Sequence, residues 1–250
     1  ARKLFFEQLN EKEYNIFWRK RSYIEKDKKY SGEERKRGAI SKLISFLHGD
    51  DTLDSFSLVL GDTNFKTKYL IALDSDSYTM QCREIIETIA HPQNHKYDLM
   101  SFTIKSNPLA SNKTPFSYAY SDSRGYDVYA FQCLNLGSDV FNQGLFCGKG
   151  IIDIERFCIK LNGKLPKNRI LSHDLIEGAW LNTIDSDAVL YENTPTDIKT
   201  HLNRSMRWTR GDWQNIVYLK SIVKDENNKP IKNQINLLSK WRIFSNINYS

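Results

Sequence analysis

The chain has 250 residues, of which 40% are hydrophobic and 26% are charged, and its formal net charge is +6. This composition is ordinary for a soluble globular protein, and the length suits one large domain or two small ones. No run of about 18 apolar residues is present, which excludes a membrane-spanning helix within the chain. The N-terminal sequence ARKLFFEQLN is not typical of a signal peptide either.

The basic charge and the cysteines restrict the classes of partner. Much of the charge lies in residues 18–38, which could form a solvated face or contact phosphate groups or anionic lipid. Because the sequence contains no recognisable nucleic-acid-binding motif, we expect no nucleic-acid partner. Cys82, Cys133, Cys147 and Cys158 lack the paired spacing of zinc ligands. They predict scattered thiols in a reducing compartment and no zinc site.

The first half of the chain alternates between predicted helices and strands. Residues 3–21 are predicted to be helical. Residues 33–48 are predicted to form a second helix, with apolar residues on one face and a capping box made by Ser31 and Glu34. The elements that follow are a strand at 54–62, a continuous apolar strand at 68–76, a helix at 79–92 that Pro92 ends, and a strand at 97–104.

The second half continues this alternation after an irregular stretch at 105–140, which is long enough to be a functional loop. The remaining elements are a strand, glycine turn and helix over 144–161, a helix at 172–184, a strand at 187–193 and a mostly helical region at 196–222. The whole pattern predicts an α/β sandwich with a mixed central sheet. The continuous run at 68–76 predicts a buried parallel strand whose carboxyl end lies at the ligand site.

Two carboxylates stand at the end of that apolar run. Asp74 and Asp76 are one residue apart, so at a strand end their side chains would point in the same direction. Carboxylate oxygens suit Mg²⁺ or Mn²⁺, and such an ion keeps positions for phosphate oxygens and water. The pair predicts half of a site for such a metal and a diphosphate, although a plain acidic turn gives the same pattern.

Asp174 is the third candidate carboxylate, at the start of the helix predicted over 172–184. If it lies near the same sheet edge, it could take a proton from a hydroxyl nucleophile. The alternative is structural, because Ser172 or Asp174 could cap the helix by accepting from first-turn amides. His173 is a neighbour rather than a candidate for the base.

A basic motif follows within the helical region at 196–222. Arg204, Arg207 and Arg210 recur at three-residue spacing, which would place them roughly along one helix face. Arginine binds phosphate bidentately, and Trp208 offers a flat apolar face for a sugar ring. A basic helix surface with one core tryptophan would give the same pattern.

The order of these motifs resembles that of the processive inverting glycosyltransferases of the family 2 type, which have a GT-A fold. A strand-end DxD is followed by an acidic base motif, here "SHD", and then by an RxxRW motif, here "RSMRW". Arginine stands first in that motif where the wider superfamily has glutamine. The chain further resembles the glycosyltransferase domain of cyclic β-1,2-glucan synthases (glycosyltransferase family 84) from about residue 33 to residue 247. The segments that carry this likeness are ERKRGAISKLISFLHG, SDVFNQGLFCGKGIIDIERF, NRILSHDLIEGAWL and RWTRGDWQ.

The resemblance implies a GT-A-like (Rossmann-like) glycosyltransferase that moves glucose from UDP-glucose, with inversion, to the 2-hydroxyl of a growing β-1,2-glucan. Asp174 would be the general base. The implied donor-binding residues are Asp74, Asp76, Arg204, Arg207, Lys36 and Arg37, with Gly38 beside them; Asp74 and Asp76 would also hold Mg²⁺ or Mn²⁺. The implied acceptor-binding residues are Trp208, Gly148, Lys149 and Gly150, and the glycines would let the backbone approach the sugar closely.

The resemblance also predicts how the chain is organised. A GT-A fold usually begins with a strand and loop that bind uridine, whereas residues 1–32 are basic and helix-like. We therefore expect residues 1–250 to be a single glycosyltransferase domain that lacks its first strand and is a fragment of a larger membrane protein. Residues 234–250 resemble an amphipathic segment leading towards a membrane span, which predicts a place at the cytoplasmic face of the bacterial inner membrane.

Three other functions stay open at this level. A non-catalytic module that binds nucleotide-sugar or glucan would bind UDP with metal but release none on addition of acceptor. A module associated with a glucan phosphorylase would release glucose 1-phosphate with phosphate, although phosphorolysis needs no DxD and the all-α barrel of such enzymes does not fit this alternation. A nucleic-acid binder would show steeply salt-dependent DNA affinity.

Overall fold

The computed structural model describes residues 15–25, 28–121, 140–170 and 172–249. The chain forms two compact units, residues 1–70 and residues 71–250. Within the described residues, no helix is both long and apolar enough to cross a membrane.

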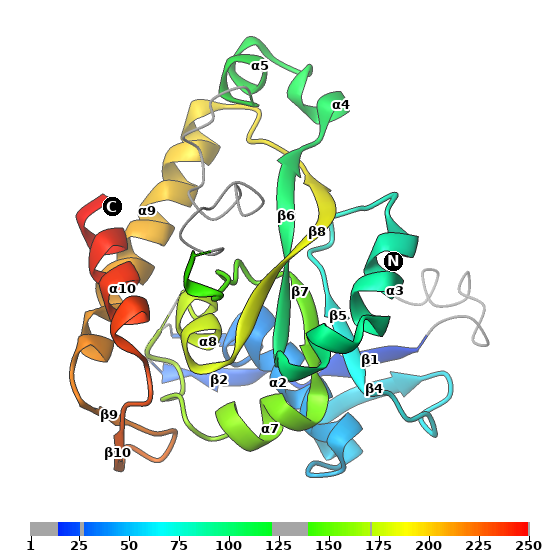
Figure 1. The fold of residues 1–250 in the computed structure, drawn as a ribbon, viewed down its shortest axis with the longest axis vertical. Helices are drawn as coiled ribbons and strands as arrows, with labels where there is room; N and C mark the ends of the chain where they lie inside the picture. Colours follow the sequence, from blue (N-terminus) through cyan, green and yellow to red (C-terminus); the bar gives the residue numbers. More distant parts are fainter. Residues whose placement is uncertain (1–14, 26–27, 122–139, 171, 250) are drawn as a thin grey trace. The chain divides into compact units, whose positions relative to one another are not determined.

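In the first unit, a helix accompanies a small antiparallel sheet (Figure 1). The strands β1 (Ile16–Arg19) and β4 (Phe56–Leu60) pair antiparallel. Phe17 and Phe56 from these strands meet Phe46 of the helix α2, with ring centroids 5.3 to 6.3 Å apart. The other elements of this unit are α2 (Arg35–His48), η2 (Leu53–Ser55) and the hairpin of β2 (Ser22–Ile24) and β3 (Lys29–Ser31).

Two predictions for this unit are wrong. Residues 16–19 form a strand instead of part of a helix, because pairing with β4 and the aromatic contacts outweigh local helix propensity; residues 1–14 lie outside the described residues. The capping box is absent, since Ser31 lies in β3 and the N-cap Glu34 has φ 55° without a side-chain cap. The start of α2 is instead held by Arg19, which donates to the carbonyl oxygens of Glu33 and Arg35 at 2.5 and 2.8 Å.

The second unit is built on a four-stranded sheet in the order β5–β7–β6–β8. The central strand β6 (Leu99–Ser106) is parallel to β8 (Thr183–Glu192) and antiparallel to β7 (Gly150–Asp153), and β6 and β8 run side by side in Figure 1. All residues of β7 and the first five residues of β6 are buried, as expected for strands covered on both faces. This arrangement confirms the predicted α/β class with a mixed sheet and is compatible with a Rossmann-like fold.

Helices of the second unit flank this sheet and extend beyond it (Figure 1). Their buried side chains, with those of the sheet, form a core that includes Phe102, Ile151, Ile176 and Ile243, each fully buried. The helices are α3 (Cys82–Ala90), η3 (Pro92–Lys96), α4 (Pro108–Ser111), α5 (Pro115–Ser121), α7 (Ile154–Leu161), α8 (Asp174–Trp180), α9 (Ile198–Gln214), η5 (Asn215–Leu219) and α10 (Leu237–Tyr249), and a short hairpin joins β9 (Ile222–Lys224) to β10 (Pro230–Lys232).

Three details of the second unit differ from the predictions. The apolar run at 68–76 is a short edge strand, β5 (Tyr69–Ala72), in which Ile71 is 42% exposed. The glycine turn at 148–150 precedes β7 instead of following a strand. Part of the stretch expected to be irregular forms α4 and α5, and residues 122–139, with Cys133, lie outside the described residues. The described cysteines are thiols, as predicted, with no disulfide among them.

Candidate functional site

The two carboxylates of the DxD lie in a tight turn beyond the end of β5. The amide of Ser77 donates to the carbonyl oxygen of Asp74 at 3.1 Å, and the amide of Asp74 donates to Ser77 Oγ at 3.3 Å. Asp74 is partly buried and Asp76 is exposed. Because the strand ends at Ala72, the side-chain directions follow from this turn, and the strand alternation used in the sequence argument does not apply.

The turn is attached to the carboxyl end of β8. Tyr78 and Tyr191 form an isolated antiparallel bridge with hydrogen bonds of 3.1 and 2.8 Å in the two directions, and their rings stack at 5.4 Å. Ser77 Oγ also donates to Glu192 Oε1 at 2.8 Å. These contacts join segments more than a hundred residues apart in the sequence and hold the DxD beside the last residue of β8.

Lys149 joins these carboxylates into one cluster. Its Nζ lies 2.8 Å from Glu192 Oε1, 3.1 Å from Glu192 Oε2 and 3.3 Å from Asp74 Oδ2. Burial favours the neutral amine, but the neighbouring charges, that of Glu192 above all, outweigh burial and raise the pKa of Lys149 above its usual value. Lys149 is therefore a permanent cation at this edge of the sheet.

Asp174 lies against the residue that precedes this lysine. Gly148 has φ 82°, and a Cβ placed on it would lie 2.8 Å from Asp174 Oδ2. One turn further along α8, a Cβ on Gly178 would lie 2.8 Å from the Cβ of Phe146. The segment 146–148 therefore runs closely along α8, and both contacts need glycine.

The helix start does not use Asp174 as its cap. The N-cap of α8 is the buried His173, whose own side chain makes no capping hydrogen bond. Asp174 is the first residue of the helix and is partly buried. Neither Ser172 nor Asp174 is therefore the N-cap residue of this helix.

Replacing Gly148 by alanine is expected to displace the Asp174 carboxylate. The added methyl group would meet both carboxylate oxygens within 3.0 Å, and the positive φ strains any L-residue there. If Asp174 acts as a general base, the rate should fall by at least about tenfold, since a displacement of this kind costs up to about 100-fold in rate. Steady-state rates with the substrates proposed below check this. A matched Gly163→Ala variant, also at positive φ but with neighbouring atoms no closer than 3.6 Å, should keep its rate; equal losses in both variants would point to backbone strain alone.

Helix α9 carries the RxxRW motif and is fixed to the segment before α8. A Cβ on Gly211 would lie 2.6 Å from the Cβ of Ser172, and the side-chain amide of Asn215 donates to the carbonyl of Ser172 at 3.2 Å. The guanidinium carbon of Arg204 lies 4.4 Å from the ring centroid of Trp208, a cation–π contact.

The three arginines of that helix do not share one face. With about 3.6 residues per turn, a three-residue step turns each arginine further round the helix axis. Arg204 and Trp208 are partly buried on the side of Gly211, whereas Arg207 and Arg210 are exposed. Arg204 and Trp208 are therefore the members of the motif closest to the packed side of α9.

The remaining predicted residues have local structural partners. Lys36 and Arg37 belong to the first unit, where both are partly buried and Arg37 pairs with Glu34. Gly38 has no room for a side chain, because a Cβ would lie 2.1 Å from the carbonyl oxygen of Glu33. Gly150 is similarly required by the sheet, since a Cβ there would lie 2.4 Å from the carbonyl oxygen of Met100.

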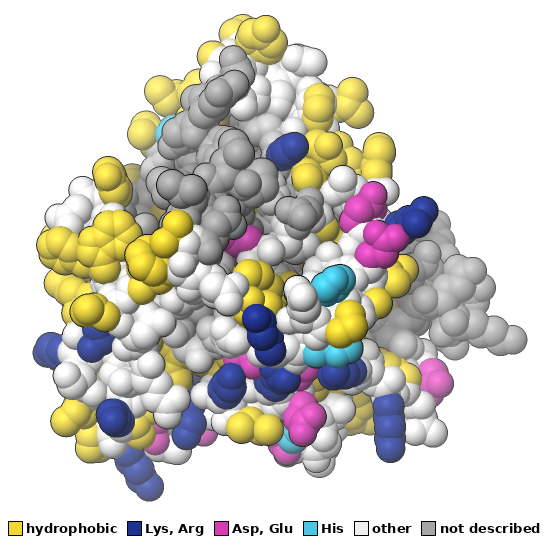
Figure 2. Space-filling view, in the orientation of Figure 1, with side chains coloured by type: hydrophobic (Ala, Val, Ile, Leu, Met, Phe, Trp, Pro, Cys, Tyr) yellow, Lys and Arg dark blue, Asp and Glu magenta, His cyan; other side chains and the backbone are white. Residues whose placement is uncertain are grey.

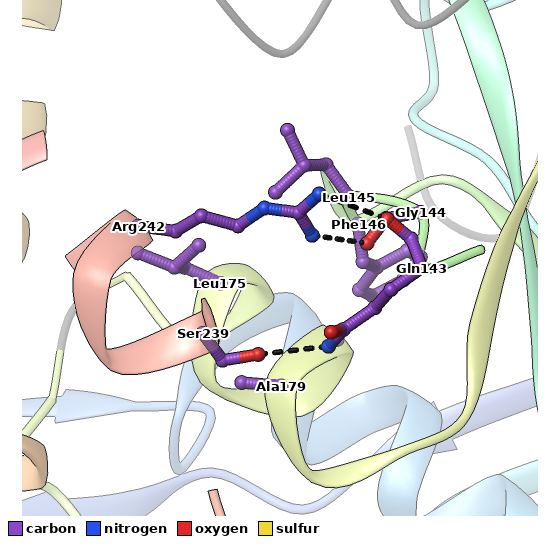
Figure 3. A pocket seen from close by; sticks show the side chains of 9 residues that line it. Gln143, Gly144, Leu145, Phe146, Leu175, Ala179, Ser239 and Arg242 are labelled. Atoms are coloured by element: carbon purple, nitrogen blue, oxygen red, sulfur yellow. Dashed lines mark hydrogen bonds between the residues drawn. The ribbon is translucent and has the colours of Figure 1, made fainter. Parts of the chain in front are cut away.

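A small pocket next to the site has a structural role (Figure 3). It lies between residues 143–146, α8 and α10, and its space open to water is about 10 Å³, which is room for about one water molecule. Arg242 of α10 donates to the carbonyl oxygens of Gly144 and Gln143 at 3.1 and 2.9 Å, and Gln143 donates to Ser239 Oγ at 2.8 Å. The pocket is too small for a sugar, and these bonds hold the segment that leads to Gly148.

The donor set at the DxD fits a hard divalent ion. The candidate ligands are the carboxylate oxygens of Asp74 and Asp76. Asp76 is exposed, and Asp74 forms an ion pair with Lys149. An ion with few protein ligands takes its remaining oxygens from phosphate and water. The residues present therefore suit Mg²⁺ or Mn²⁺ bound together with a diphosphate.

Sequence reasoning missed two members of the cluster, Glu192 and Ser77. Glu192 follows the apolar run 188–191 at the end of β8, and its side chain is only 11% exposed. A carboxylate that ends an apolar strand is the same signal that drew attention to Asp74, so Glu192 could have been found by the same rule. The role of Ser77 depends on the turn geometry and left no signal in the sequence.

The chain is similar in sequence to a curated glucan synthase. No family model matches the chain. The chain is 29% identical over 252 residues to the Cyclic beta-(1,2)-glucan synthase NdvB of Rhizobium meliloti (strain 1021). The match covers 94% of the chain and 8% of that protein, so the chain spans less than a tenth of the length of the curated relative it matches. Nearly the whole chain is thus similar to one part of a β-glucan synthase.

Proposed function

We propose that the chain is an inverting glycosyltransferase that moves glucose from UDP-glucose to the 2-hydroxyl of a β-glucan acceptor. One observation carries the proposal: consecutive residues Gly148 and Lys149 contact Asp174 and Asp74 respectively. Neighbouring Cα atoms are about 3.8 Å apart, so one lysine side chain links the backbone beside the candidate base to the candidate diphosphate site. Inverting transfer needs this arrangement, with a base on the acceptor side and a charge-stabilising site on the leaving-group side.

In this proposal Asp174 accepts the proton of the acceptor hydroxyl as its oxygen attacks C1 of glucose. The bond from C1 to the UDP oxygen breaks on the opposite face, and the negative charge passes to the diphosphate. Asp76 and Asp74 would hold Mg²⁺ or Mn²⁺, which neutralises charge on the leaving diphosphate when bound. Arg204 would contribute positive charge to the diphosphate, and Trp208 would offer its ring to the acceptor sugar.

Measuring product release tests the proposal against its rivals. The chain is incubated with UDP-glucose, Mn²⁺ and a β-1,2-linked gluco-oligosaccharide, and released UDP and elongated oligosaccharide are quantified together. Equal amounts of both, dependent on acceptor and metal, are expected. Metal-dependent UDP binding without release would indicate a non-catalytic module. Release of glucose 1-phosphate on addition of phosphate would indicate phosphorolysis, and DNA binding that is insensitive to UDP would indicate a nucleic-acid binder.

We further propose that the C-terminal helix contacts the cytoplasmic face of the bacterial inner membrane in a longer protein. One face of α10 is buried through Ser239, Ile243 and Ile247. Its other face exposes large apolar side chains at helical spacing, which Figure 2 shows with those of α9 as a gathering of hydrophobic side chains. The exposed residues of α10 are Leu237 at 83%, Trp241 at 63% and Phe244 at 54%. Tryptophan and phenylalanine on a basic helix are typical of segments that lie in a membrane interface.

A vesicle assay tests this contact. Replacing Trp241 and Phe244 together by alanine is expected to weaken binding to phosphatidylglycerol-containing vesicles by at least about tenfold. The two aromatic side chains would no longer transfer their apolar surface from water into the membrane. Co-sedimentation measures the bound fraction. Leu109→Ala, which removes an apolar residue on α4 that is even more exposed, at 81%, should change little. Equal binding by the double variant and the unaltered chain would argue against the proposal.

A further inference from the structure

We propose that Lys149 is a ligand of the donor diphosphate and that Glu192 positions it, a role on the donor side of the site instead of the acceptor side. The inference rests on the proposed transferase function and adds to it a protein cation that binds phosphate. It starts from the cluster of Lys149, Glu192, Asp74 and Ser77, which joins the DxD turn, the start of β7 and the end of β8.

The three contacts of the ammonium group are unequal. Glu192 accepts from it with both carboxylate oxygens, at 2.8 and 3.1 Å, and is 11% exposed. Asp74 is the longer contact at 3.3 Å and is 35% exposed. An ammonium group has three N–H donors, so a phosphate oxygen can replace the more distant and more exposed partner while the bonds to Glu192 stay. The solvent side of Lys149 is therefore the side of the DxD.

Charge also favours this role. The Lys149 side chain is 12% exposed, and the cluster of one cation with two carboxylates is a net anion. With Asp76 counted, a divalent ion at Asp74 and Asp76 would bring the cluster to neutrality, which removes its repulsion of a diphosphate.

Glu192 has no such role, because its side chain is only 11% exposed and a carboxylate repels a phosphate. Ser77 Oγ donates to one carboxylate oxygen of Glu192, and the ammonium group of Lys149 contacts both carboxylate oxygens. Glu192 can therefore affect a phosphate only by fixing the direction of the lysine side chain. This makes it a positioning residue, and its effect should depend on the presence of Lys149.

Binding measurements on variants test the assignment. Titration calorimetry with UDP and Mn²⁺, and separately with a β-1,2-linked gluco-oligosaccharide, would be run on the chain and on Lys149→Met, Lys149→Arg and Glu192→Gln. Lys149→Met should weaken UDP binding by about 10- to 100-fold, the usual effect of a charge-assisted hydrogen bond, and leave oligosaccharide affinity unchanged. Lys149→Arg should restore most of the UDP affinity. Glu192→Gln should weaken UDP less than Lys149→Met and should add no further loss in the double variant.

Lys160→Met is a matched control for loss of a buried ion pair. Lys160 Nζ lies 2.6 Å from the fully buried Asp98, the residue immediately before the first residue of β6. This variant should lose stability and keep UDP affinity. Unchanged UDP affinity in Lys149→Met, or a loss of oligosaccharide affinity alone, would overturn the proposal. Losses of UDP affinity for Lys149→Met and Glu192→Gln that add in the double variant would also overturn it. If the unaltered chain binds no UDP at all, the transferase proposal itself fails, which is a different result from a variant-specific one.

Discussion

Replacing Asp174 by asparagine is expected to lower the rate of glucose transfer by at least about 100-fold, the contribution typical of a positioned general base. Asparagine has nearly the same shape, so the contact with Gly148 should survive while the proton acceptor is lost. UDP binding should be unchanged, because Asp174 contacts the residue before Lys149 and has no role in holding the diphosphate in the proposed mechanism. Steady-state transfer rates and UDP calorimetry on the same preparation separate the two effects.

Asp153→Asn is the matched control for that experiment. Asp153 also stands at a helix start in the second unit, where its carboxylate accepts from the amide of Arg156 at 3.0 Å. Asparagine keeps an oxygen that can accept from this amide, so the replacement should change stability little and should leave the rate per folded molecule unchanged. A rate for Asp174→Asn within a few-fold of the unaltered chain would remove Asp174 from the role of base. A parallel fall in UDP affinity would assign it to donor binding.

Replacing Asp76 by alanine, or removing the metal with a chelator, is expected to abolish metal-dependent UDP binding. Asp76 is the exposed carboxylate of the turn, whereas Asp74 forms an ion pair with Lys149. The charge of Asp74 is therefore partly neutralised, and Asp76 should contribute most to binding the metal ion. Because the ion has few protein ligands, loss of one should weaken the binding of both the metal ion and UDP by at least about 100-fold. The ion needs the phosphate oxygens of UDP as ligands, and the diphosphate needs the positive charge of the ion. Calorimetry with UDP at several Mn²⁺ concentrations measures the coupling.

Asp225→Ala is the control for that measurement. Asp225 also lies in a turn of the second unit, where its carboxylate accepts from the amides of Asn227 and Lys229 at 2.9 and 2.8 Å. Its removal should disturb that turn and leave UDP binding intact. If Asp76→Ala binds UDP as tightly as the unaltered chain, or if binding is unaffected by the chelator, the metal assignment is wrong. Donor recognition would then have to rest on side chains such as Arg204.

Much of the fold followed from local patterns. The helices α2, α3, α8 and α9 lie within ranges that apolar periodicity predicted, and Pro92 ends the run that contains α3. Helices with one apolar face and clear stop signals are decided by short-range effects, so the sequence is sufficient for them. The strand β1 was missed because its stability comes from pairing with β4 about forty residues later, which no local window contains.

The candidate site shows the same division. The sequence by itself determined the chemical types: a carboxylate pair, a third carboxylate at a helix start, a glycine turn and an arginine–tryptophan motif. Only the tertiary structure decided that Gly148 touches Asp174, that Lys149 reaches Asp74, and that Glu192 completes the cluster. The physical reason is that chemical type is a property of single residues, whereas proximity depends on how the turn after β5, the residue before β7 and the last residue of β8 are brought together. That meeting is a long-range result of packing and hydrogen bonding, and it determines which of the candidate residues can act together.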